Sequence, residues 1–174
     1  MPREGLQWWH VIISTLNSWL PGDPRGFRSR SLKIHSSGDY KNPPPPGEHA
    51  GLRRYHKARA GAPVVIPAEC RETVGKALLT KLQKLGYRVL AIAVAPTHSH
   101  WLAELPADEK EVRLLVGQCK TTSSHAIRDQ APGRVWAYRG KNIAVKDRAH
   151  QLNVYQYILK QKDAWIWDFK QAQG

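Results

Sequence analysis

The sequence predicts an α+β fold in which one central antiparallel sheet carries helices packed on its faces. Three observations favour it: apolar runs rich in β-branched and aromatic residues, helical spacing in the segments between them, and a strand–turn–strand pattern in mid-chain. The first apolar run, WWHVIIST, predicts a buried strand over residues 9–15 that ends before Pro21-Gly22. The order of the later elements agrees with this fold class.

Regular elements resume after residue 63. The apolar residues of PAECRETVGKALLTKLQKLG recur at helical spacing and predict an amphipathic helix that begins near Pro67 and stops at Gly86. Residues 87–95 form a nearly continuous apolar run that is typical of a buried strand. After a turn at Pro96-Thr97, residues 98–105 alternate as a second strand does. This pair is the expected central hairpin.

The C-terminal third predicts two more helices. Asp108 and Glu111 have the spacing of a capping box, which opens a helix through about residue 129. A short strand is expected at 135–138 and a turn at Gly140-Lys141-Asn142. Asp147 is expected to cap the last helix.

The segment from about residue 21 to residue 63 differs in composition from the rest of the chain. It holds four consecutive prolines at 43–46, which favour an extended polyproline conformation, and few large apolar residues. Nine of the 27 Lys and Arg residues lie in it, and residues 53–59 are expected to form a short helix. We therefore expect a single domain over 1–174, with a basic Pro-rich insertion at about 21–63 and a short C-terminal tail at 165–174.

The charge favours a polyanionic partner. The formal net charge is +13 and the isoelectric point is near 10.0, which favours nucleic acid over an acidic small molecule. Cys70 and Cys119 are the two cysteines, so a disulfide scaffold and a Cys-based zinc module are excluded and a reducing cytoplasm is expected. No apolar stretch reaches the roughly 18 residues that a membrane span needs, so no membrane partner is expected.

His98 and His100 are the first candidate site residues. Residues i and i+2 of a strand point to the same face, so both imidazoles project side by side as a metal-binding pair. A chance HxH triplet without a metal is the alternative. Glu104 shares their face and could neighbour a metal, although a solvated carboxylate is the expected state. His10 is expected to be a packed or sheet-face histidine, and His125 either to line the site or to belong to a polar DNA-contacting face.

Tyr157 and Gln161 form the second candidate pair. They are four residues apart on the predicted last helix and share one face, so an amide oxygen could complete a metal site beside a tyrosine hydroxyl. Simple helix packing is the alternative reading of both tyrosines. Tyr155 is the runner-up nucleophile, but its partner four residues on, Leu159, cannot bind a metal.

These motifs together resemble a known family. A buried strand running into PTHSHWLAELP, followed by a helix and then a terminal helix with YILKQ, is similar to the single-tyrosine HUH transposases, including the REP-associated tyrosine transposases of bacteria. HUH denotes two histidines around a bulky hydrophobic residue on a strand. The resemblance spans about residues 9–165, and the insertion has no counterpart in it. Ser99 departs from the pattern, and because it should point to the opposite face it bears on packing more than on metal binding.

The resemblance implies an HUH endonuclease or ferredoxin-like arrangement and a specific chemistry. His98, His100 and Gln161 would bind a divalent metal, Mg²⁺ or Mn²⁺, and Tyr157 would be the nucleophile. The implied activity is that of a transposase or recombinase: it nicks and rejoins single-stranded DNA, often beside a hairpin, through a phosphotyrosine intermediate. Some relatives are homodimers and others monomers. The implied location is the bacterial cytoplasm, in association with the nucleoid.

Basic residues are expected to hold the DNA. Arginines interleaved with aromatic residues suit a surface where phosphates are paired and bases stacked, whereas a solvated loop is an equally weighted alternative. The residues expected to bind nucleic acid are Arg25, Arg28, Arg30, Arg53, Arg54, Lys57, Arg59 and Lys120. Two other functions stay open: a catalytically inactive DNA- or RNA-binding protein of the same fold, and a histidine-dependent phosphoesterase acting on RNA, which typically needs a second histidine motif on a paired strand.

Overall fold

The computed structural model describes residues 1–25, 27, 36–37, 42 and 44–170. The chain divides into two compact units, one formed by residues 1–16 with 64–174 and the other by residues 17–63. Within the described residues, no helix is both long and apolar enough to cross a membrane. The larger unit holds the sheet and every candidate metal ligand.

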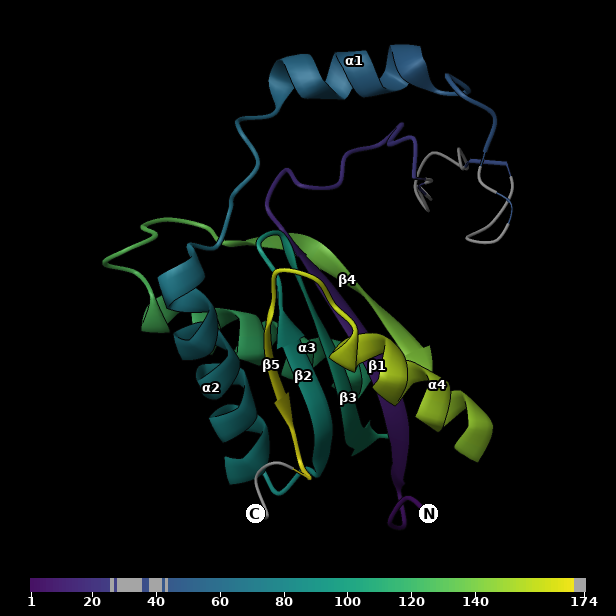
Figure 1. The fold of residues 1–174 in the computed structure, drawn as a ribbon, viewed down its shortest axis with the longest axis vertical. Coiled ribbons are helices and arrows are strands. Elements are labelled where there is room, and N and C mark those ends of the chain that lie inside the picture. Colours follow the sequence, from purple (N-terminus) through teal and green to yellow (C-terminus); the bar gives the residue numbers. More distant parts are fainter. Residues whose placement is uncertain (26, 28–35, 38–41, 43, 171–174) are drawn as a thin grey trace. The chain divides into compact units, whose positions relative to one another are not determined.

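The larger unit is a five-stranded antiparallel sheet with helices on both faces (Figure 1). Its strands lie in the order β4-β1-β3-β2-β5, and the first four with their two crossover helices have the ferredoxin-like β-α-β-β-α-β arrangement. The predicted α+β fold class is therefore confirmed. The elements of this unit are β1 (Leu6–Thr15), α2 (Ala68–Lys84), β2 (Val89–Val94), β3 (His98–Pro106), α3 (Glu109–Ala126), β4 (Trp136–Ala144), α4 (Arg148–Leu159) and β5 (Trp165–Asp168).

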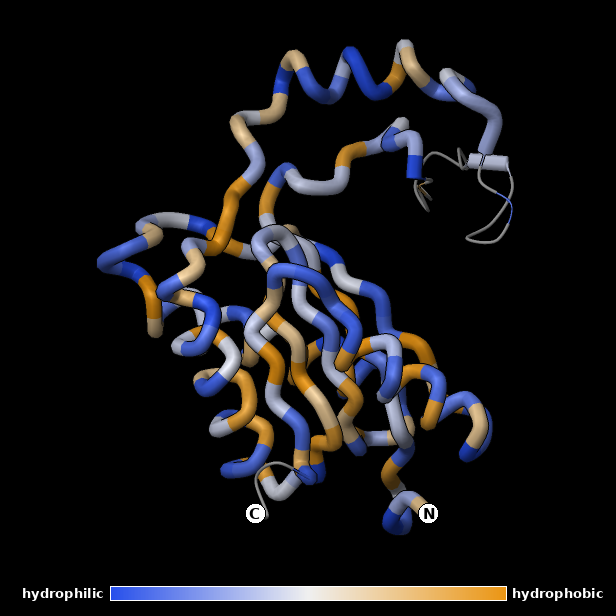
Figure 2. Tube along the Cα trace, in the orientation of Figure 1, coloured by the Kyte–Doolittle hydropathy of each residue, from blue (hydrophilic) through white to orange (hydrophobic). Residues whose placement is uncertain are grey.

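The two faces of the sheet are covered differently. Helices α2 and α3 pack side by side on one face and bury the larger apolar core, whereas α4 packs on the other face over β2, β3 and β5 (Figure 1). Hydrophobic and hydrophilic residues alternate around the turns of α2 (Figure 2), as expected for a helix with one buried stripe. Odd-numbered β3 residues such as Trp101 face α2 and α3, and even-numbered ones such as Leu102 face α4.

The predicted starts and stops of the helices are largely confirmed. Pro67 precedes α2, and Gly86 follows it with a positive φ of 81°, a conformation that glycine adopts without strain. The Asp108 carboxylate caps α3 by accepting from the backbone N–H of Lys110, and Asp147 caps α4 by accepting from that of His150.

Two predicted features near the C-terminus differ from the structure. The expected turn at Gly140-Lys141-Asn142 is wrong, because β4 runs straight through it and pairs with β1. Gly140 is there because β1 passes close by: a Cβ at this position would lie 2.8 Å from the Ile12 carbonyl oxygen. Residues 165–168, which the pattern placed in a tail, form the edge strand β5 against β2.

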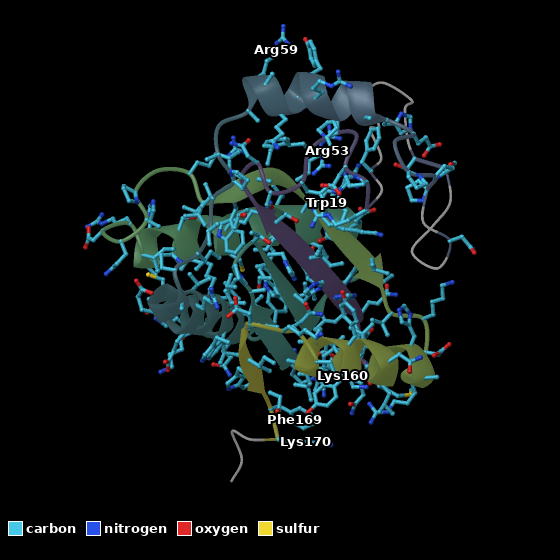
Figure 3. The ribbon with its side chains drawn as sticks, turned by 45° about the horizontal axis from the view of Figure 1, so that its top comes forward. Trp19, Arg53, Arg59, Lys160, Phe169 and Lys170 are labelled. Atoms are coloured by element: carbon cyan, nitrogen blue, oxygen red, sulfur yellow. The ribbon has the colours of Figure 1, made fainter. Side chains whose placement is uncertain are left out.

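The smaller unit contains α1 (Ala50–Arg59), which includes the short helix expected at 53–59. No residue of α1 is buried, and the side chains of Arg53 and Arg59 project from this helix (Figure 3). The chain leaves the sheet at Leu16 and returns at Val64, whose N–H donates to the Leu16 carbonyl at 2.9 Å. The unit is therefore inserted between two adjacent points of the larger one.

Candidate active site beside helix α4

Three histidines meet on the α4 face of the sheet. The register pairs Ile12 of β1 with His100 of β3, so His10, His98 and His100 all project to this face. The Nε2 atom of His10 lies 3.0 Å from Nδ1 of His100 in a buried hydrogen bond, and the rings of His98 and His100 are 5.0 Å apart between centroids. The expected side-by-side placement of His98 and His100 is present in the fold.

Helix α4 brings Tyr157 to the same place, and Gln161, which was expected on this helix, follows two residues after its end at Leu159. The Tyr157 ring lies edge-on to His100 at 5.2 Å and to His10 at 6.0 Å, measured between ring centroids. Gln161 donates through Nε2 to the Tyr157 carbonyl at 3.2 Å, and this bond turns its Oε1 atom toward His98, 3.2 Å from Nε2. Besides His10, the cluster thus joins His98 and His100 to Tyr157 and Gln161, and the contact of His98 with Gln161 spans 63 positions of sequence.

Burial keeps two of the histidines neutral. Removal from water lowers the pKa of His100 to about 3, and the neighbouring His10 and His98 add to the effect. Burial likewise lowers the pKa of His10 to about 4, with contributions from His150 and Lys141. Neutral imidazoles have an unprotonated nitrogen, the form that can bind a metal ion. Because Nδ1 of His100 is bonded to His10, its Nε2 is the nitrogen left for a ligand.

The two tyrosines of α4 have opposite environments. Tyr157 is 52% exposed, whereas Tyr155 is 8% exposed and packs against Phe169. Burial raises the pKa of Tyr155, and the nearby Asp168 raises it further. A hydroxyl that must reach a phosphate has access at Tyr157 and not at Tyr155.

Ser99 points to the opposite face, as strand parity requires, and its polarity is satisfied there. Its hydroxyl donates to the Ala93 carbonyl at 2.8 Å and accepts from the Trp101 indole N–H at 2.9 Å, all fully buried. A serine between the two histidines therefore supports the packing of Trp101 and leaves the face that carries His98 and His100 unchanged.

The expected solvated state of Glu104 is wrong. Its carboxylate is fully buried at the far end of β3, where it accepts hydrogen bonds from Arg88 and Arg3. Strand parity places Glu104 on the same face of the sheet as His98, but six residues further along β3. His125 lies at the end of α3 on the opposite face of the sheet and does not line the site.

The residues expected to bind nucleic acid are dispersed. Lys120 donates through Nζ to the Ala137 carbonyl at 2.8 Å, and its half-buried position lowers its pKa to about 8. Arg25 pairs with Asp23 and stacks over the Trp19 ring at 3.9 Å. Arg53, Arg54 and Lys57 line a cavity of the smaller unit, and Arg59 stacks over Tyr55 at 3.8 Å. Arg28 and Arg30 lie outside the described residues. The binding roles of all eight stay predictions.

The donor atoms of the site fit a divalent metal. Two imidazole nitrogens and one amide oxygen are a mixed set of the kind that binds first-row divalent ions, and the His98 and Gln161 donors already converge. The described residues contain no group of three or more His, Cys, Asp and Glu side chains placed to hold a metal ion. The candidate set is of a different kind, because its third member besides His98 and His100 is the amide of Gln161.

His10 is the site residue whose contact the sequence analysis missed. It was expected to be a packed or sheet-face histidine, and it is buried, but its bond to His100 depends on the pairing of β1 with β3 over 90 residues of sequence. No local spacing signals that pairing. A histidine within a buried strand, which must find a polar partner, is the one available clue.

Comparisons with known proteins are sparse. No protein family model and no curated protein matches the sequence. Among solved structures, a REP-associated tyrosine transposase bound to a REP hairpin is similar, with a TM-score of 0.48 and 14% identity over 91% of this chain and 67% of that one. At that identity and TM-score, the functional assignment depends on the geometry of this chain's own residues.

Proposed function

We propose that the chain is a metal-dependent tyrosine transposase or recombinase that nicks and rejoins single-stranded DNA through a 5′-phosphotyrosine intermediate. The observation that carries the proposal is an exposed Tyr157 phenol whose ring lies 5.2 Å from that of His100, beside the paired donors of His98 and Gln161. A nucleophile next to convergent metal donors is the arrangement that phosphoryl transfer needs.

The reaction follows from these residues. The Tyr157 oxygen forms a bond to phosphorus as the bond from phosphorus to the 3′ oxygen breaks; the phenol loses its proton and the leaving oxygen gains one. Mg²⁺ or Mn²⁺ held by His98, His100 and Gln161 would supply charge withdrawal from a non-bridging phosphate oxygen. The phosphoester is conserved in the tyrosine link, so a 3′-hydroxyl can later displace Tyr157 without ATP.

The neutral state of His100 supports this assignment, because burial keeps its pKa near 3 and its imidazole unprotonated at neutral pH. The alternative of a catalytically inactive DNA- or RNA-binding protein predicts no covalent product. A histidine-dependent phosphoesterase would need a second histidine presented to substrate. His10 is on the paired strand, but it is 7% exposed and bonded to His100, which argues against that role.

The test is covalent capture of DNA by the full chain. A pool of 3′-labelled hairpin oligonucleotides with randomised single-stranded flanks is incubated with Mg²⁺ or Mn²⁺, and SDS-resistant adducts are separated on a gel. We expect an adduct from the parent and from Tyr155→Phe, and none from Tyr157→Phe or in EDTA. Absence of adduct from the parent, or its persistence in Tyr157→Phe, contradicts the proposal. Release of free 5′-phosphate without adduct would favour the phosphoesterase.

A further inference from the structure

Helix α4 leaves the β4 edge of its face of the sheet uncovered. It packs over β2, β3 and β5 and reaches Trp8 and His10 of β1, whereas β4, the strand next to β1, extends beyond it. By strand parity Ile12, Ser14 and Lys141 are among the exposed or half-buried side chains that point to this uncovered part, and the exposed Arg139 follows on β4 where the β1–β4 register shifts. We call these four residues the open shelf.

The strand register places one of the shelf's two cations, Lys141, level with a candidate metal ligand. Ile12 pairs on one side with His100 and on the other with Lys141, so these three residues form one row across the sheet. Adjacent strands are about 4.8 Å apart, so the Cα atoms of Lys141 and His100 are separated by roughly 10 Å. Arg139 lies two residues before Lys141 on β4, in the part of the strand where the pairing with β1 shifts register.

The shelf is positively charged. Arg139 and Lys141 are both exposed, and no ion pair is found for either among the described residues. Neither β1 nor β4 contains an aspartate or glutamate. Arginine and lysine side chains are long enough to cover much of the distance to the Tyr157 site, and a polyanion crossing β1 and β4 meets no acidic side chain of these strands.

We propose that the DNA strand extends from Tyr157 across the open shelf, where Arg139 and Lys141 bind phosphates that neighbour the cleaved one. This inference rests on the proposed function, since it takes the phosphate attacked by Tyr157 as the point from which the strand extends. These contacts are made to the backbone, so they hold the strand in place irrespective of base sequence. Neither residue is among the eight that the sequence predicts to bind nucleic acid, seven of which lie in the insertion and the eighth of which is Lys120.

The test measures binding apart from chemistry. The full chain carrying Tyr157→Phe is titrated in EDTA into a fluorescein-labelled single-stranded oligonucleotide, and anisotropy is followed from 50 to 200 mM salt. Adding Arg139→Ala and Lys141→Ala should lower the slope of log K against log salt by about 1.4, because each phosphate contact to a single strand contributes about 0.7. We expect affinity near 0.1 M salt to fall roughly tenfold.

A charge-matched control uses Lys84→Ala with Lys110→Ala, which lie on α2 and α3 of the opposite face. The control should keep the parental slope, and the exchange Arg139→Lys with Lys141→Arg should keep it too. A shelf variant with the parental slope, or one no different from the control, overturns the proposal. Failure to form an adduct would instead contradict the Tyr157 chemistry, which this measurement does not use.

Discussion

The two faces of the sheet differ in how their covering helices end. On one face α2 and α3 together bury Ile13 and Trp101 completely, and the serine among them has its hydrogen-bond partners. On the other, α4 covers the centre and stops, so buried histidines lie beside an exposed tyrosine. The polar side chains of the candidate site lie where the cover by α4 ends: burial lowers the pKa of His10 and His100, while the Tyr157 hydroxyl stays accessible.

The largest expected effect separates the two faces by stability. Leu78→Ala on α2 removes a fully buried side chain and should lower the free energy of unfolding by about 2–5 kcal/mol. Tyr157→Phe, at an exposed position, should change it by less than about 0.5 kcal/mol. Urea unfolding of both variants measures this contrast. Equal losses would mean that the α4 face is as tightly packed around Tyr157 as the other face is around Leu78.

A second prediction concerns acid stability. Arg88 and Arg3 lower the pKa of the buried Glu104 from its ordinary 4.5 to about 2, with Arg88 the larger influence. The folded state therefore gains stability above pH 4.5, on the order of 3 kcal/mol, and loses it as pH falls toward 2. Unfolding free energies across this range should show that loss in the parent. Glu104→Gln should be less stable at neutral pH and nearly flat in this window; a parental pH profile would refute the assignment.

Ser99→Ala tests whether the two faces of a single strand, β3, have separate roles. The variant leaves the buried Trp101 indole N–H without its acceptor, which should cost about 1–3 kcal/mol of stability. Because Ser99 faces away from the candidate site, the affinity for Mn²⁺ should be unchanged. Thermal unfolding and Mn²⁺ titration followed by electron paramagnetic resonance measure the two quantities. A change in Mn²⁺ affinity with intact stability would reverse the assigned face.

The smallest expected effect is at His10. His10→Phe keeps a ring in the same buried space but removes the partner of His100 Nδ1, so the orientation of the ligand ring is lost. We expect Mn²⁺ affinity to fall roughly tenfold while far-ultraviolet circular dichroism stays unchanged. Unaltered Mn²⁺ affinity in a folded variant would show that His10 only fills space.

Local patterns predicted most of the larger unit. The spacing of apolar residues and the caps at Asp108 and Asp147 located the long helices, since these signals lie within a few residues of one another. The same kind of signal placed His98 with His100, and Tyr157 with Gln161. Nothing local could show that the two pairs meet, because the contact of His98 with Gln161 spans 63 residues.

The misjudged elements share a physical cause. Gly140 suggested a turn, but its missing side chain allows β1 to approach, and that neighbour is distant in sequence. The strand at 165–168 exists because β2 offers it an edge, and Glu104 is buried because Arg3 and Arg88 come to it. Each outcome depends on a partner that the local sequence does not specify.

The α+β class, the residue types of the candidate site and the face of each strand on which they lie follow from local sequence, because periodicity is a property of the local backbone. Which faces meet depends on the packing of the whole fold. The pairing of β1 with β3 and β4 joined His10 to His100 and aligned Lys141 with them, and the packing of α4 left Tyr157 exposed. Strand register and helix docking depend on which apolar faces become buried together in the whole fold, and no single segment of the sequence carries that information.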